Sequence, residues 1–156
     1  MSKVAFYTLG CRVNQYESDA MAELFVNQGY EVVDFASKAD IYIINTCDVT
    51  NESARKSRQS IRKAIRNNPD AKIAVVGCYA QLQAEEISQI PGVDVVVGTK
   101  HRHRIVEFIE KSVRDDDRII AVEDIMKERS FEDIAFRGFR QRTRAFLKIQ
   151  EGCNMF

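Results

Sequence analysis

Short, almost wholly apolar segments alternate with longer amphipathic segments between residues 3 and 113. The apolar segments are rich in β-branched residues, as in ADIYIIN (39–45), AKIAVV (71–76) and VDVVV (93–97). Runs of this length and composition are typical of strands that are buried on both faces of a parallel sheet. The amphipathic segments between them are long enough to form the helical crossovers that parallel strands need. The pattern therefore predicts an α/β fold.

The expected elements define the architecture more closely. Strands are predicted at residues 3–9, 31–33, 39–45, 71–76 and 93–97, and helices after residue 11 and at about 50–66, 80–89 and 102–113. Gly29 is expected to end the first helix. In the last helix, the residues predicted to face the core are Ile105, Phe108, Ile109 and Val113. This order of strands and helices predicts a flavodoxin-like open parallel sheet of order 2-1-3-4-5, with helices on both faces.

This pattern ends near residue 113. Residues 114–142 are charged with scattered aromatic side chains, and they are predicted to form a linker with one further short strand at 118–122. Residues 143–149 (TRAFLKI) alternate again, as a strand does, and they have no evident partner in the first sheet. We therefore expect a domain over residues 1–113, a linker, and the start of a second domain over 143–156.

Composition narrows the class of protein without indicating a partner. The chain has 23 basic and 23 acidic residues, so its net charge favours no particular ligand. Neither an apolar run of about 18 residues nor a secretory signal is present in the sequence. A cytoplasmic protein with no membrane association is expected.

Cysteines follow three strands that the predicted order makes neighbours. The first, third and fourth strands are followed by Cys11, Cys47 and Cys78, and glycine precedes two of them, at Gly10 and Gly77. The carboxyl ends of parallel strands meet at one edge of a sheet, with adjacent strands about 4.8 Å apart. The three thiols are therefore expected within reach of a single metal cluster.

Several interpretations of this arrangement remain open. Three thiolates are one fewer than the four that usually hold a 4Fe–4S cluster, so one iron would keep an open position. The cysteines could instead fill the core, or bind zinc together with His101 or His103. A non-catalytic flavodoxin-like module could take a nucleotide or flavin phosphate at the same edge, although no loop has the pattern of a glycine-rich phosphate loop.

Five segments, in order, resemble the radical S-adenosylmethionine methylthiotransferases. They are TLGCRVNQYES from Thr8, INTCDVTNES from Ile44, VVGCYAQ from Val75, PGVDVVVGT from Pro91 and LKIQEGCN from Leu147. The resemblance implies that an auxiliary 4Fe–4S cluster is held by Cys11, Cys47 and Cys78. It also implies that Cys153 opens the CxxxCxxC motif of a radical domain, whose other cysteines would lie past Phe156. The chain is thus expected to be a truncated piece of a longer enzyme, inactive alone.

The implied enzyme carries two 4Fe–4S clusters and uses S-adenosylmethionine. A deoxyadenosyl radical would take hydrogen from carbon 2 of a modified adenosine beside the tRNA anticodon, and a methylthio group would be inserted there. The stretches around Cys11 and Cys47 most resemble the subfamily that acts on threonylcarbamoyladenosine. Enzymes that act on isopentenyladenosine in tRNA, or on an aspartate of a ribosomal protein, are the alternatives.

Basic residues gather in two places. The helix after Cys47 carries Arg55, Lys56, Arg58, Arg62, Lys63 and Arg66, and a second group precedes Cys153, at Arg137, Arg140, Arg142 and Arg144. A basic helix face attracts phosphates. We therefore predict that this helix guides the anticodon stem-loop of tRNA toward the cluster; a solvated face paired with acidic neighbours is the alternative.

Overall fold

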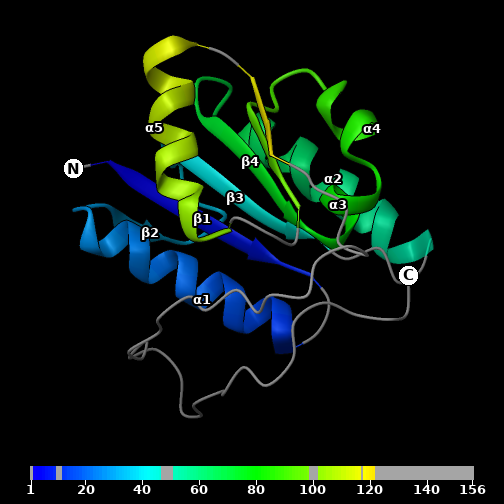
Figure 1. The fold of residues 1–156 in the computed structure, drawn as a ribbon, viewed down its shortest axis with the longest axis horizontal. Helices are drawn as coiled ribbons and strands as arrows, with labels where there is room; N and C mark the ends of the chain where they lie inside the picture. The colour runs from blue at the N-terminus through cyan, green and yellow to red at the C-terminus, as the bar shows by residue number, and fades with distance from the viewer. Residues whose placement is uncertain (1, 10–11, 47–50, 99–101, 117, 122–156) are drawn as a thin grey trace.

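The described residues form one parallel sheet of six strands with order β2-β1-β3-β4-β5-β6 (Figure 1). A computed structural model describes residues 2–9, 12–46, 51–98, 102–116 and 118–121. The strands are β1 (Lys3–Thr8), β2 (Glu31–Val33), β3 (Ile41–Thr46), β4 (Lys72–Gly77), β5 (Val95–Val97) and β6 (Ile119–Ala121). The predicted open parallel sheet is confirmed, and its order holds for the first five strands.

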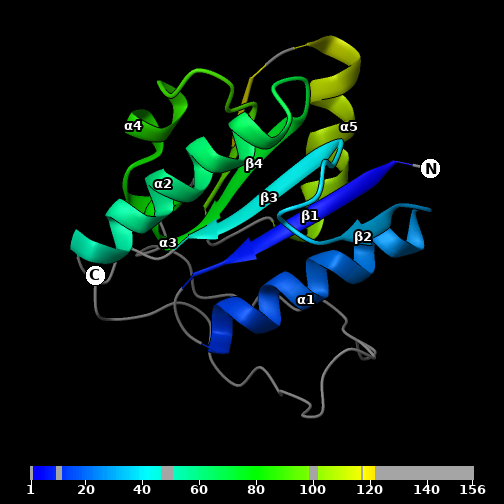
Figure 2. The ribbon, with the colours of Figure 1, turned by 180° about the vertical axis from the view of Figure 1, so that it is seen from behind.

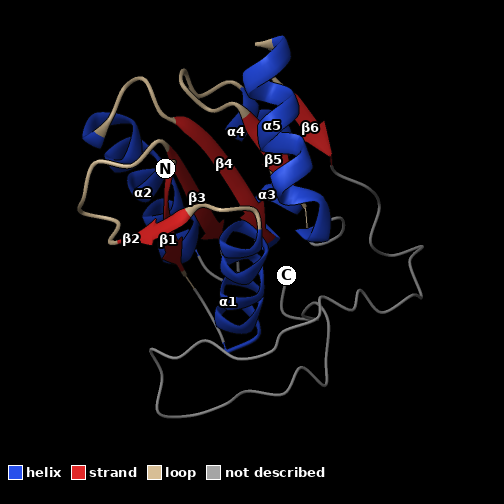
Figure 3. Cartoon of the chain, turned by 90° about the vertical axis from the view of Figure 1, so that its left-hand side faces the viewer, coloured by secondary structure: helices blue, strands red, loops and turns tan. Residues whose placement is uncertain are grey.

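Helices cover both faces of this sheet (Figure 3). They are α1 (Arg12–Asn27), α2 (Asn51–Asn67), α3 (Cys78–Leu82), α4 (Ala84–Ser88) and α5 (Ile105–Asp115), with a 3₁₀ turn, η1 (Arg102–Arg104), before α5. Side chains of α2, α3 and α4 pack on one face, and side chains of α1 and α5 pack on the other. Figure 2 shows α2 lying along its face of the sheet. No helix in the described part of the chain is long and apolar enough to cross a membrane.

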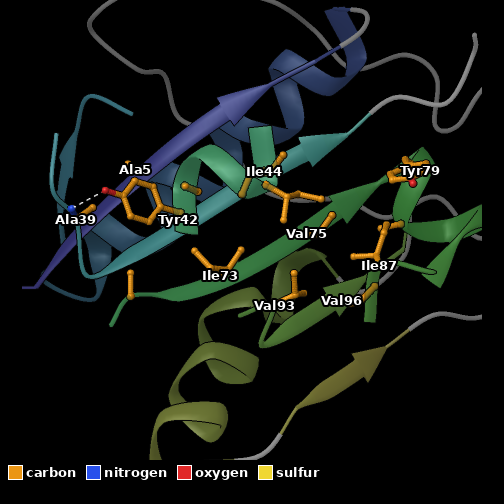
Figure 4. Packing of buried hydrophobic residues seen from close by; sticks show 14 of the residues in the cluster. Ala5, Ala39, Tyr42, Ile44, Ile73, Val75, Tyr79, Ile87, Val93 and Val96 are labelled. Carbon is orange, nitrogen blue, oxygen red and sulfur yellow. Dashed lines mark hydrogen bonds between the residues drawn. The ribbon is translucent and has the colours of Figure 1, made fainter. Parts of the chain in front are cut away.

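The central strand β3 is buried along its whole length. Because successive side chains of a strand point to opposite faces, Tyr42 and Ile44 pack under α2 while Ile43 packs under α1 and α5. Figure 4 shows Ile44 beside Val75 of β4, and Tyr42 beside Ala39, in the first of these cores. The Tyr42 hydroxyl accepts a hydrogen bond from the backbone N–H of Ala39 at 3.0 Å, so the phenol is buried without losing its polar contact. The apolar runs thus form strands covered on both sides, as their composition predicts.

Two predicted helices differ in detail. The helix expected over 80–89 is two short helices that meet at Gln83, and the first of them begins at Cys78. No glycine or proline marks this break in the sequence. In α5, Val113 was predicted to face the core but is 58% exposed, and Ser112 is fully buried in its place. Ser112 lies seven residues after Ile105 and continues the buried stripe along α5, whereas Val113 lies beside it on the solvent side.

The sheet continues beyond residue 113. α5 ends at Asp115, and β6 then pairs in parallel with β5, with Val95 opposite Ile119. The backbone N–H of Ile119 donates to the carbonyl oxygen of Asp94 at 2.9 Å, which fixes the start of β6. The short strand expected at 118–122 is therefore present and belongs to the sheet.

Candidate functional site

The carboxyl ends of β1, β3 and β4 lie level at one edge of the sheet. Thr8 is the register partner of Asn45, and Thr46 is the register partner of Gly77. These pairs put the last residues of three neighbouring strands side by side (Figure 1). The neighbourhood of the first, third and fourth strands, predicted from the sequence, is confirmed.

The described residues include one of the four cysteines. Cys78 is the first residue of α3, directly after β4, and its side chain is half-buried. The other three predicted site cysteines lie outside the described residues: Cys11, Cys47 and Cys153. Their convergence on one cluster therefore stays a prediction. Among the described residues, no group of three or more His, Cys, Asp or Glu side chains is arranged to hold a metal ion.

The two histidines weighed for a zinc site follow a different strand. His103 lies in η1 after β5 and is exposed, and His101 lies outside the described residues. Cys78 follows β4, the inner neighbour of β5 in the sheet. The described part of the site thus puts Cys78 and His103 after two different strands.

Gly77 shapes the turn from β4 into α3. Its φ angle is +98°, a backbone conformation that L side chains rarely adopt. A Cβ atom there would lie 2.6 Å from Oδ1 of Asn45 and 2.6 Å from the carbonyl oxygen of Thr46. Both contacts are shorter than real Cβ atoms make, so only glycine fits. The absence of a side chain lets β4 pass close to the end of β3 just before Cys78.

A buried polar network holds this edge together. The side-chain Nδ2 of Asn14 donates to the carbonyl oxygens of Leu9, at 2.7 Å, and Thr46, at 2.9 Å. Asn45 in turn donates from Nδ2 to the carbonyl oxygen of Asn14, at 2.8 Å, and to Oγ of Ser18, at 3.1 Å. The four polar residues of this network, Asn14, Ser18, Asn45 and Thr46, are each at most 4% exposed. The hydrogen bonds join α1 to the ends of β1 and β3.

The same network reaches β4 through Thr46. The Thr46 hydroxyl donates to the carbonyl oxygen of Val76 at 2.6 Å and accepts from the backbone N–H of Ala80 at 3.3 Å. Sequence reasoning missed these polar residues. The available signal was the polar pair Asn45-Thr46 at the end of an otherwise apolar run, directly before Cys47. Polar side chains in a buried strand need partners, and at a strand end those partners are the neighbouring loops.

α2 and α3 are joined by a buried phenol. Tyr79, 1% exposed, accepts a hydrogen bond at its hydroxyl from Nη1 of Arg58 at 3.2 Å. Burial raises the pKa of the Tyr79 phenol. The same Nη1 of Arg58 lies 3.8 Å from Oε1 of Glu86 in α4. Arg58 therefore fixes α2 against the segment that begins at Cys78. Arg58 was grouped with the basic residues predicted to attract phosphates, but in the structure its guanidinium contacts Tyr79 and Glu86.

The remaining basic side chains of α2 point outward. The exposed ones are Arg55, Lys56, Arg62, Lys63 and Arg66. They lie opposite the buried face formed by Ala54, Ile61 and Ala64. Arg55 pairs with Glu52 at 2.7 Å, and this hydrogen bond lowers the pKa of the Glu52 carboxyl. The outer face of α2 is thus strongly basic, and one of its cations is neutralised locally.

The described residues form an α/β domain in which three adjacent strands end at one edge of the sheet, and in the sequence Cys11, Cys47 and Cys78 follow these strands. Residues 3–98 match the model of the uncharacterized protein family UPF0004, and the chain belongs to this family.

The names of this chain's relatives refer to tRNA and to methylthio groups. The threonylcarbamoyladenosine tRNA methylthiotransferase MtaB of Bacillus subtilis is 53% identical over all of the chain and 35% of its own length. MtaB of Aquifex aeolicus is 42% identical over 99% of the chain and 38% of its own length. A tRNA-2-methylthio-N(6)-dimethylallyladenosine synthase of Cereibacter sphaeroides is 36% identical over 99% of the chain and 36% of its own length. The resemblance to methylthiotransferases is confirmed, and the chain spans little more than a third of these relatives.

Proposed function

We propose that this chain is the N-terminal part of a tRNA methylthiotransferase, and that the carboxyl edge of β1, β3 and β4 binds its auxiliary 4Fe–4S cluster. The observation that carries the proposal is the register of the three strands. Thr46, directly before Cys47, is paired with Gly77, directly before Cys78, and Thr8 of β1 is paired with Asn45 beside them. The loops that carry the three cysteines therefore start from neighbouring points.

The described residues suit such a group. The thiol of Cys78 is half-buried at the sheet edge, and Gly77, with its φ of +98°, lets the chain turn from β4 into Cys78 close to the end of β3. The ligands would be the thiolates of Cys11, Cys47 and Cys78. A cluster held by these three thiolates would have one thiolate fewer than usual, and it would supply sulfur chemistry at an iron that no cysteine of this set binds. Cys153 would be the first ligand of a second cluster, which serves the cleavage of S-adenosylmethionine.

The protein's own residues would supply order and charge at this edge. Buried hydrogen bonds of Asn14, Asn45 and Thr46 hold the strand ends in place. The exposed cations of α2 extend along the helix from its start, four residues after Cys47, to Arg66 in its last turn, so they can bind a phosphate backbone that reaches this edge along α2. This basic outer face of α2 is the proposed contact for the anticodon stem-loop.

The substrate we propose is threonylcarbamoyladenosine next to the anticodon, in tRNA of the cytoplasm. Support comes from the higher identities, 53% and 42%, to relatives with that name, against 36% to a dimethylallyladenosine enzyme. Modification of dimethylallyladenosine, the isopentenyladenosine of the second subfamily, is the alternative function.

Anaerobic reconstitution of the chain with iron and sulfide tests the cluster. We expect about four irons and four sulfides per chain, with the broad visible absorption of a 4Fe–4S centre. Cys47→Ala should lose most of this iron because it removes one of three ligands. Cys153→Ala is the matched control and should keep it, since Cys153 belongs to the other motif. Zinc bound without sulfide, bound flavin, or equal iron loss in both variants would contradict the proposal.

A further inference from the structure

Asn14 lies at the proposed cluster edge but supplies no ligand. Its side chain is 4% exposed, and its Nδ2 donates to the carbonyl oxygens of Leu9 and Thr46 at 2.7 and 2.9 Å. Leu9 is two residues before Cys11, and Thr46 is directly before Cys47. A single amide group therefore bridges the backbone segments that lead into two of the three proposed ligands.

Further hydrogen bonds extend this bridge to the third ligand. The backbone N–H of Leu9 donates to the carbonyl oxygen of Asn45 at 2.9 Å, so Leu9 is held through both of its backbone polar groups. The Thr46 hydroxyl donates to the carbonyl oxygen of Val76, two residues before Cys78. A continuous hydrogen-bonded path thus joins the chain before Cys11, Cys47 and Cys78.

The position demands an amide. The NH₂ group has two protons, and here each one meets a carbonyl oxygen on a different strand end. An aspartate would offer only acceptors to these two oxygens, and a serine would offer one donor. Loss of the amide would take one hydrogen-bond donor from the buried carbonyl oxygen of Thr46 and one from the part-buried carbonyl oxygen of Leu9, which is unfavourable.

We propose that Asn14 is a positioning residue for the cluster: it holds the approach to Cys11 and the approach to Cys47 at a set separation before iron binds. The inference rests on the proposed function. A ligand set that is ordered in advance binds more tightly, because less of the binding free energy is spent on ordering loops. The positioning role of Asn14 should therefore appear in the rate at which the reconstituted chain releases iron.

A matched control exists at the other end of the strands. Asn68 is 5% exposed, donates from Nδ2 to the carbonyl oxygen of Ala39 at 2.8 Å and accepts from the backbone N–H of Asp70 at 3.2 Å. Ala39 and Asp70 precede β3 and β4, at the edge opposite the cysteines. Asn68→Ala also removes a buried side-chain amide, as Asn14→Ala does, but at the edge opposite the proposed cysteine ligands.

The experiment compares iron release from the anaerobically reconstituted chain to a strong chelator, followed by loss of the cluster absorption. Asn14→Ala should release iron about tenfold faster than the wild type, because it loses one buried and one part-buried hydrogen bond at the strand ends. Asn68→Ala should stay within about twofold, although both variants lower the melting temperature of the metal-free chain by similar amounts. Wild-type release from Asn14→Ala, or equally fast release from both variants, would overturn the inference.

A second variant covers the case in which Asn14→Ala does not fold. Thr46→Val keeps the shape of the side chain but removes the hydroxyl that reaches Val76 and Ala80, so release should again be faster, by about fivefold. If Asn14→Ala is unfolded or also releases iron at the wild-type rate, an unchanged release rate in Thr46→Val overturns the positioning role. The proposed function would not be affected by that result. A wild-type chain that takes up no iron overturns the proposed function, and the inference falls with it.

Discussion

At the scale of single residues, the proposed site depends on positions that are not themselves ligands. Gly77 shows this most directly, since its φ of +98° and the contacts of a hypothetical Cβ both exclude a side chain. Gly29, at the end of α1, has a similar φ of +90°, but a Cβ there would meet nothing within 4 Å. A side chain at Gly29 would therefore cause backbone strain only, whereas a side chain at Gly77 would cause both backbone strain and steric overlap.

Gly77→Ala should destabilise the chain by about 3 kcal/mol, because backbone strain adds to overpacking against Asn45 and Thr46. Gly29→Ala carries only the backbone strain and should destabilise it by about 1 kcal/mol. Urea unfolding of the metal-free chain, followed by circular dichroism, measures both. Equal losses would show that the end of β3 can move away from residue 77.

At the scale of secondary structure elements, α2 has an inner face that packs on the sheet and an outer face that is proposed to bind RNA. Its inner face packs on the sheet through Ala54, Ile61 and Ala64, and Arg58 fixes it to α3 through the Tyr79 hydroxyl. Its outer face carries the exposed cations proposed to meet RNA. Since Arg58 has this structural contact, a test of RNA binding has to leave Arg58 unchanged and use cations further along the helix.

The double variant Arg62→Glu/Arg66→Glu should weaken binding of an anticodon stem-loop RNA to the intact protein about tenfold at low salt. It should also reduce the slope of log affinity against log salt by about one to two, because up to two phosphate contacts are lost. Lys111→Glu/Arg114→Glu, on exposed positions of α5 across the sheet, makes the same charge change and should leave both quantities unchanged. An equal effect of the two double variants would point to net charge instead of the α2 face.

At the scale of the whole molecule, the apolar cores that stabilise the fold lie on the two faces of the sheet, and the proposed site lies at its carboxyl edge. Two apolar cores, one on each face, hold the strands, and the polar network lies at the carboxyl edge between them. The chain spans little more than a third of the length of its relatives, and we propose that the reaction needs a longer protein of which this chain is the N-terminal part. The substrate is accordingly tested there and not in the chain alone.

Deletion of the gene should abolish the 2-methylthio form of threonylcarbamoyladenosine in cellular tRNA and leave the methylthiolated dimethylallyladenosine unchanged. Mass spectrometry of tRNA nucleosides measures both. The intact gene should restore the signal, whereas a copy with Cys47→Ala should not, because the auxiliary cluster would lose a ligand. Loss of the dimethylallyladenosine product instead would assign the protein to the alternative function.

The sequence by itself determined the class of fold and the neighbourhood of the three strands that precede the candidate ligands. Runs such as ADIYIIN are too apolar for a strand with a solvated face, so a parallel sheet with helices on both faces followed, and with it the shared edge of the first, third and fourth strands. Local patterns could not give the break at Gln83 or the burial of Ser112 in place of Val113. Both are decided by packing against the sheet.

Only the tertiary structure decided how the edge is held together. Asn14 and Thr46 are 32 residues apart, and nothing in their local sequence indicates that one amide reaches both Leu9 and Thr46. The same holds for Arg58, whose charge suggested a phosphate contact but whose guanidinium binds the Tyr79 hydroxyl 21 residues away. Hydrophobic periodicity is a property of neighbouring residues and can be read along the chain. The partners of buried polar groups are set by which segments the folded sheet brings together.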